Sequence, residues 1–126
     1  MIKKIISIEK LKKIIFKQKA KKKVVLCHGV FDLLHVGHIY HFEEAKEHGD
    51  LVIVSVTPDK YVNKAPNRPF FNFTNRAKVI SSLSLVDYVI KSDNETSVEI
   101  IKFLKFLFDC NSRKLGVFGE DMLTVI

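Results

Sequence analysis

The sequence lacks tryptophan, has only two cysteines and contains no long uninterrupted apolar run. The two cysteines, Cys27 and Cys110, provide no disulfide framework, so a reduced, cytoplasmic setting is expected. No apolar stretch approaches the roughly 20 residues that a membrane span requires. Lysines interrupt the apolar positions at the N-terminus, so we expect no signal peptide.

The composition is that of a chain that can fold around a core. A length of 126 residues suits one domain, and residues 1–126 are predicted to form a single unit. A hydrophobic content of 47%, with 10% aromatic residues, excludes wholesale disorder.

The positive charge is concentrated at the N-terminus. The formal net charge is +7, but residues 1–23 hold ten lysines and one glutamate, and the remainder has more acidic than basic residues. Such a segment could attract nucleic acid or anionic lipid, yet a solvated helix face is the favoured interpretation. No aromatic stacking platform is interleaved with the lysines, so a nucleic-acid-binding module is less favoured.

The N-terminal segment has the periodicity of an amphipathic helix. Ser7 is its expected N-cap. Residues 20–23 form a basic connector, so residues 1–23 are predicted to be a leading helix and a linker. The apolar positions that recur at helical spacing are Ile5, Ile8, Leu11, Ile14 and Ile15.

The residues after this connector predict a strand, a glycine turn and a helix. Val24–Cys27 is a short apolar run that suits a buried strand. Gly29 permits the backbone geometry that the chain needs as it leaves the sheet. A helix is expected from about Leu34 until Gly49 stops it.

Two histidines at the start of that helix are candidates for chemistry. His35 and His38 are three residues apart and share a helix face. A helix N-terminus attracts anions, and Gly37 has no Cβ, so a phosphate can approach the backbone. Two imidazoles there could donate hydrogen bonds to a polyphosphate whose charge grows during transfer. A metal cluster of both with His41 and Asp32 is less favoured, because the rings would run along one side of a helix.

The next apolar run completes a strand–helix–strand unit. Leu51–Val56 is almost continuously apolar, as buried parallel strands are. Ligands of such sheets bind beyond the carboxyl ends of the strands, so residues 29–32 and 57–59 should open onto the same crevice. The pattern predicts an α/β fold, a Rossmann-like α/β/α sandwich with a mainly parallel sheet.

Residues 60–73 are too polar and too broken by proline for a regular element. Lys64 and Arg68 either reach substrate phosphates from this loop or are ordinary surface charges. Three aromatic residues, Phe70, Phe71 and Phe73, are expected to anchor it.

The remaining elements are a helix, a strand and a second helix. Thr74 is the expected cap of a helix over Asn75–Leu83. Spacing alone places Arg76 of that helix at the surface. A third strand is expected over Val86–Ile90, and another helix over Val98–Leu104.

The signature of the cytidylyltransferase-like nucleotidyltransferases resembles one stretch of this chain, Gly29-Val30-Phe31-Asp32-Leu33-Leu34-His35-Val36-Gly37-His38. That family includes glycerol-3-phosphate cytidylyltransferases and the adenylyltransferase domain of heptose-phosphate enzymes. The resemblance runs from about Ile6 to Lys105.

The resemblance implies an activity and a set of site residues. CMP or AMP would pass from CTP or ATP to a phosphorylated sugar or polyol, with Mg²⁺ bridging the phosphates and pyrophosphate leaving. His35 and His38 would be catalytic. Asp59 would touch the acceptor or the ribose, and Lys64 would bind the substrate. Asp32 either binds the nucleotide or only braces its loop. No protein metal ligands are expected, and a homodimer is possible. The implied nucleotide-binding residues are Gly29, Val30, Phe31, Asp32, Gly37 and Arg76.

The resemblance fades at the C-terminus. Residues 106–126 depart from the family pattern, in which a serine- and threonine-rich segment binds the nucleotide phosphates from the opposite side. A C-terminally truncated chain is therefore expected, and a non-catalytic nucleotide-binding remnant is the alternative function. Val30 stands where many cytidylyltransferases have threonine, and the choice between cytosine and adenine is left open.

Overall fold

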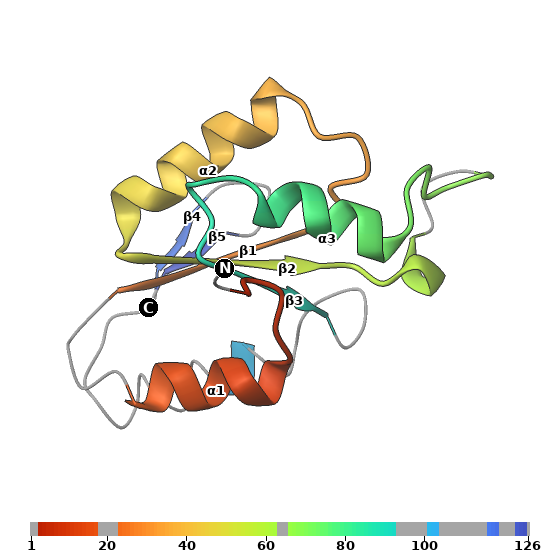
Figure 1. Ribbon diagram of the computed structural model, residues 1–126. Coiled ribbons are helices and arrows are strands. Elements are labelled where there is room, and N and C mark those ends of the chain that lie inside the picture. Colours follow the sequence, from red (N-terminus) through yellow and green to blue (C-terminus); the bar gives the residue numbers. More distant parts are fainter. Residues whose placement is uncertain are drawn as a thin grey trace.

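The computed structural model describes residues 3–17, 23–62, 66–92 and 101–103, together with the backbone of two short strands after them. Helices lie on both sides of a central sheet, α1 on one side and α2 and α3 on the other (Figure 1). The helices are α1 (Ile8–Lys17), α2 (Val36–His48), α3 (Phe73–Ser81) and the 3₁₀ turn η1 (Asp59–Tyr61). The strands are β1 (Val24–Gly29), β2 (Leu51–Val56), β3 (Tyr88–Lys91), β4 (Gly116–Phe118) and β5 (Leu123–Val125).

The sheet has the strand order β3-β2-β1-β5-β4. β1, β2 and β3 are parallel, while β5 runs antiparallel to β1 and β4 antiparallel to β5. This arrangement confirms the predicted Rossmann-like α/β class. The two antiparallel strands both come from residues 106–126, the part of the sequence that departs from the expected pattern.

The two faces of the sheet are covered because strand side chains alternate. Val24 and Leu26 of β1 belong to the core cluster beneath α1, which contributes Leu11 and Ile15. Side chains at the alternate positions of β1 and β2 belong to the cluster beneath α2 and α3. A strand buried on both faces favours apolar residues at successive positions, which is why Val24–Cys27 and Leu51–Val54 are continuous apolar runs. Ser55 of β2 is a buried polar exception. The cluster beneath α2 and α3 includes Val25, Cys27, Val52, Val54 and Val56.

Cys27 lies within this core and has no exposed surface. Burial raises the pKa of its thiol to about 12. The thiol therefore stays protonated near neutral pH and acts as a small apolar side chain.

The leading segment packs on the domain, with Leu11 and Ile15 in the core beneath the sheet. The Ser7 hydroxyl accepts a hydrogen bond from the Lys10 amide at 3.2 Å, which confirms the expected cap. Just before it, the Ile6 amide donates to the Val89 carbonyl at 3.0 Å, so the chain adds one bridge to the edge of β3. The opposite face of α1 is open to solvent, where Phe16 is 72% exposed.

Several element boundaries differ from those predicted. α3 begins at Phe73 rather than Asn75, because the Asn72 side chain, not Thr74, caps it by accepting from the Asn75 amide at 2.9 Å. The third strand begins at Tyr88, since the Val86 amide is bonded to the Leu83 carbonyl in the preceding turn. Among the described residues, no helix is both long and apolar enough to cross a bilayer.

The core predicts a large difference between two phenylalanines. Phe42 of α2 is completely buried, so Phe42→Ala should lower the free energy of unfolding by about 3 to 5 kcal/mol. Phe16→Ala, at an exposed position, should change it by less than about 0.5 kcal/mol. Urea denaturation of both variants measures these values, and similar losses would contradict the assigned packing of α1 and α2.

Candidate functional site

The loops that follow β1 and β2 meet at the carboxyl edge of the sheet. The backbone amide and the hydroxyl of Thr57 both donate to the Gly29 carbonyl, at 3.0 and 3.2 Å. This pair of bonds joins the end of one strand to the first residue beyond the other. The predicted juxtaposition of residues 29–32 with residues 57–59 is therefore present.

Gly29 and Phe31 shape the turn out of β1. Phe31 has φ 52°, in the left-handed region that side chains other than glycine seldom adopt. Its ring folds back, so that a Cβ on Gly29 would lie 3.0 Å from it. The ring then packs between His38 and Phe42, with both centroid distances at 5.5 Å. Burial of the ring offsets the cost of the unusual backbone.

His35 and His38 cap α2 reciprocally. His35 is the N-cap residue, and its Nδ1 accepts a hydrogen bond from the Gly37 amide at 3.0 Å. His38, at the third helical position, accepts from the His35 amide through its own Nδ1 at 3.1 Å. This is the geometry of a capping box, built from two imidazoles in place of a hydroxyl and a carboxylate. It moves the helix start two residues beyond the expected Leu34.

The cap determines which nitrogen of each ring carries the proton. A backbone amide can only donate, so each Nδ1 must be the acceptor and each Nε2 must bear the hydrogen of the neutral ring. The two rings lie side by side, with centroids 4.1 Å apart. The N-terminus of α2 thus carries two neighbouring N–H donors supplied by side chains.

Gly37 is required by this cap. A Cβ at position 37 would lie 2.6 Å from Cε1 and 2.9 Å from Nδ1 of the His35 ring. The missing side chain makes room for the imidazole itself. The predicted opening for a phosphate at Gly37 stays a prediction.

Asp32 ties a distant loop to the β1 turn. Its Oδ2 accepts from Arg68 Nη1 at 3.0 Å and from the Phe70 amide at 2.8 Å, and its Oδ1 accepts from the Phe71 amide at 2.9 Å. Burial alone would raise the pKa of this carboxyl. The Phe71 and Phe70 amides and the Arg68 charge outweigh that effect, and the pKa is lowered.

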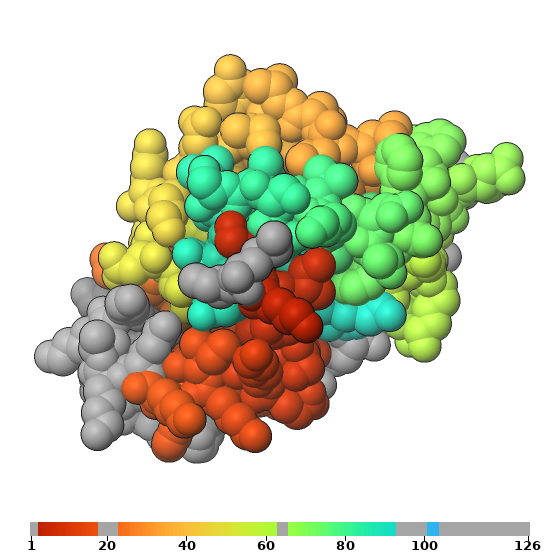
Figure 2. Space-filling view, in the orientation of Figure 1, coloured from red at the N-terminus to blue at the C-terminus, as the bar shows by residue number. Residues whose placement is uncertain are grey.

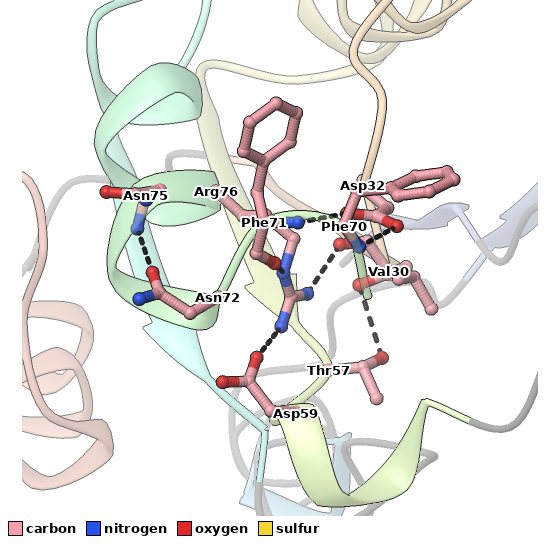
Figure 3. Close-up of polar contacts among 10 residues, drawn as sticks. Val30, Asp32, Thr57, Asp59, Phe70, Phe71, Asn72, Asn75 and Arg76 are labelled. Carbon is pink, nitrogen blue, oxygen red and sulfur yellow. Dashed lines mark hydrogen bonds and ion pairs between the residues drawn. The ribbon is translucent and has the colours of Figure 1, made fainter. Parts of the chain in front are cut away.

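Arg76 is buried, and its predicted place at the surface is wrong. Its guanidinium, 0% exposed, donates to the Phe71 carbonyl at 2.8 Å, to the Val30 carbonyl at 2.7 Å and to Asp59 Oδ1 at 2.6 Å (Figure 3). One side chain therefore connects the loops after β1 and β2 with the segment before α3. Contact between Arg76 and a nucleotide, which the resemblance implies, would require these loops to open.

Of the two predicted substrate-binding residues, the structure describes Asp59 but not Lys64. The Asp59 carboxylate lies in η1 with one oxygen on Arg76, and its side chain is 46% exposed at the site. Lys64 lies outside the described residues. In the described ranges, no group of three or more His, Cys, Asp or Glu side chains is arranged to hold a metal ion.

The predicted anchoring role of the aromatic loop is only partly right. Phe73 packs against the core, but Phe70 and Phe71 are 57% and 49% exposed. The loop is held instead through its backbone amides by Asp32, and the Arg68 guanidinium lies over the Phe70 ring at 4.1 Å from its centroid. Nothing in the spacing of these residues signals which rings are buried.

The lowered pKa of Asp32 predicts a pH-dependent contribution to stability. Because the folded-state pKa lies below the unfolded value of about 3.9, the contribution is present above that value and is lost as pH falls through the folded pKa. Chemical denaturation of wild type and Asp32→Asn should show a stability difference that shrinks as pH falls from about 6 to about 3. A difference independent of pH would show that the charge of Asp32 is not what holds the loop.

Comparisons with known proteins identify the family of the chain. The family model described as cytidylyltransferase-like matches residues 26–126. The bifunctional protein HldE of Aliarcobacter butzleri is 43% identical over 86 residues, which cover 67% of this chain and 18% of that protein. The HldE of Geobacter metallireducens is 37% identical over 126 residues, covering 95% and 26%. The chain therefore spans about a quarter or less of the length of these relatives.

A solved structure supports the same assignment. The lipopolysaccharide core biosynthesis protein from Thermoplasma volcanium has a TM-score of 0.55 and 33% sequence identity, with 64% of this chain and 66% of that chain covered. The family match includes the β1 turn, both capping histidines and the loops that Arg76 joins. The chain belongs to the cytidylyltransferase-like family.

Proposed function

We propose that this chain transfers a nucleotidyl group from CTP or ATP to a phosphorylated sugar or polyol and releases pyrophosphate. The observation that carries the proposal is the reciprocal cap of His35 and His38 at the start of α2. The family assignment supports a nucleotidyltransferase, and the substrates rest on what the relatives imply.

The cap fixes the orientation of two imidazole N–H donors, to which we propose that an anion binds. With Nδ1 of each ring engaged by a backbone amide, each neutral imidazole carries its proton on Nε2. The helix N-terminus adds a partial positive charge of about half a unit. Donors fixed before the substrate arrives need no reorganisation when charge builds up on the phosphoryl oxygens, which is the main source of electrostatic stabilisation.

The remaining site residues would position the reacting groups. Nucleotidyl transfer asks for alignment and charge neutralisation more than for covalent chemistry by the protein. Arg76 holds the β1 loop, the β2 loop and the residues before α3 in one arrangement. Asp59 is half exposed beside Arg76, which supports our inference that it touches the acceptor or the ribose.

Mg²⁺ is proposed to enter with the nucleotide. Mg²⁺ is commonly bound through substrate phosphates and water with few protein ligands. The part of the chain that the structure describes offers no cluster of three ligating side chains. Bound to the triphosphate, the ion would neutralise charge on the departing pyrophosphate.

The relatives indicate the class of acceptor. One solved relative is named as a lipopolysaccharide core biosynthesis protein. Lipopolysaccharide cores contain sugars, so we favour a sugar phosphate over a polyol phosphate. The choice between CTP and ATP is left to experiment.

Replacing either capping histidine should abolish most activity while the fold persists. His35→Ala and His38→Ala are each expected to lower kcat/KM by about 100- to 1,000-fold, the usual effect of removing one transition-state donor. Pyrophosphate release should be measured with CTP and with ATP, each with a panel of sugar phosphates. His48→Gln, at the other end of α2, is the matched control and should retain activity.

Two results would contradict the proposal. Activity unchanged in both variants would remove the histidines from the mechanism. Saturable binding of a triphosphate without turnover on any acceptor would favour the non-catalytic nucleotide-binding chain instead.

Gly37→Ala separates function from stability. The new methyl group must displace the His35 imidazole, so activity should fall about as far as in His35→Ala. Loss of the cap costs about 1 kcal/mol, while alanine gains about 1 kcal/mol over glycine inside a helix. The unfolding free energy should therefore change little, as thermal or urea denaturation can show. Full activity in Gly37→Ala would mean that the observed ring position is not needed.

A further inference from the structure

Two phenylalanine rings stand exposed beside the start of the histidine motif. Phe70 and Phe71 are 57% and 49% exposed, although adjacent aromatic side chains are among the most costly to leave in water. They belong to the loop after Pro66, which projects from the edge of the molecule at the right of Figure 2. Exposed apolar groups that lie next to one another and are rimmed by polar residues are candidates for a binding surface.

The loop that carries these rings is held firmly. The amides of both phenylalanines donate to Asp32, three residues before His35. The Phe71 carbonyl accepts from the buried guanidinium of Arg76. In Figure 3 the Phe71 ring points away from that guanidinium while its backbone is held on both sides. The backbone that carries both rings is therefore held in place, which reduces the entropy lost when a ligand binds them.

A cation lies directly beside one ring. The Arg68 guanidinium is 4.1 Å from the Phe70 centroid, and its side chain is 31% exposed. The Asp32 carboxylate orients it through Nη1 at 3.0 Å. The loop thus offers an apolar ring face and a guanidinium as immediate neighbours, next to the β1 turn.

We propose that Phe70 and Phe71 form an acceptor wall, against which the ring of a cyclic sugar phosphate packs, with Arg68 beside its phosphate. This inference rests on the proposed function and adds the residues that would select a cyclic sugar phosphate as the acceptor. A cyclic sugar has an apolar face of C–H groups and carries a charged phosphate. The wall matches both features, whereas an open-chain polyol phosphate has no ring face to cover the phenylalanines.

The nucleobase of the donor is the less fitting occupant. A neutral base needs no guanidinium beside the aromatic ring. The charge of the donor lies in its triphosphate, for which the N-terminus of α2 already provides two imidazole donors. The arginine next to the exposed rings is therefore better matched to the second, phosphorylated substrate.

Calorimetric titration of the whole chain tests the acceptor wall. The probes are a cyclic heptose phosphate, open-chain glycerol 3-phosphate, and CTP and ATP with magnesium. In the double variant Phe70→Ala, Phe71→Ala, affinity for the heptose phosphate should fall about tenfold or more, as expected for losing aromatic anchors. Affinity for glycerol 3-phosphate and for the nucleotide should stay within about twofold.

Three variants serve as controls. Phe16→Ala removes a phenylalanine that is even more exposed, on α1 across the sheet, and should change no affinity. Phe70→Leu and Phe71→Leu keep apolar bulk without a ring, and they replace the alanine variants if those unfold. They should show a smaller loss for the heptose phosphate.

The outcomes that overturn the inference are distinct from those that overturn the function. Weaker nucleotide binding in the double variant would mean that the rings stack on the base. A changed oligomeric state on size exclusion would make them an interface between copies. Heptose phosphate binding that is absent in wild type, or unchanged in the double variant, refutes the wall. If the nucleotide still binds in a His38-dependent way, the proposed nucleotide site survives that refutation.

Discussion

The arrangement of the site depends on one buried side chain. Arg76 places a guanidinium where no solvent reaches it, and a buried charge is tolerated only when it is paired and its donors are used. Asp59 supplies the opposite charge, and the carbonyls of Val30 and Phe71 take two further N–H groups. Three loops that leave different elements are thereby joined at a single point. Losing the guanidinium would leave a carboxylate and two carbonyls without their partner at once.

The loop that Arg76 holds from one side is held from the other by Asp32. From its place in the sequence motif, Asp32 could be interpreted as a residue that binds the nucleotide or a metal ion. Here its two oxygens accept three hydrogen bonds from the segment 68–71. The lowered pKa of Asp32 reflects that role, since amides and an arginine stabilise the carboxylate against the effect of burial. The same contacts decide where Phe70 and Phe71 stand relative to the motif.

In His35 and His38, one ring nitrogen caps the helix and the other carries the proton that the proposed chemistry uses. Nδ1 of His35 and His38 satisfies backbone amides at the start of α2, and the N–H of each ring remains on Nε2. The spacing of two histidines around a glycine follows from this geometry: the first ring occupies the volume that a side chain at position 37 would take. A motif that looks like a set of phosphate ligands is also the N-cap of its own helix. The Phe31 ring, packed against His38, links it to the core.

The sequence alone determined the α/β class, the strands β1 and β2, the amphipathic α1 and the His35–His38 pair, because these depend on periodicity and on neighbours a few residues apart. Boundaries such as the start of α3 at Phe73 could not be predicted, since Asn72 and Thr74 are both good caps and only packing chooses between them. The tertiary structure alone decided that Arg76 is buried, that Asp32 braces a loop and that Phe70 and Phe71 face solvent. The contact between Arg76 and Val30 joins residues 46 positions apart, and no local pattern encodes which distant carbonyl a guanidinium will meet.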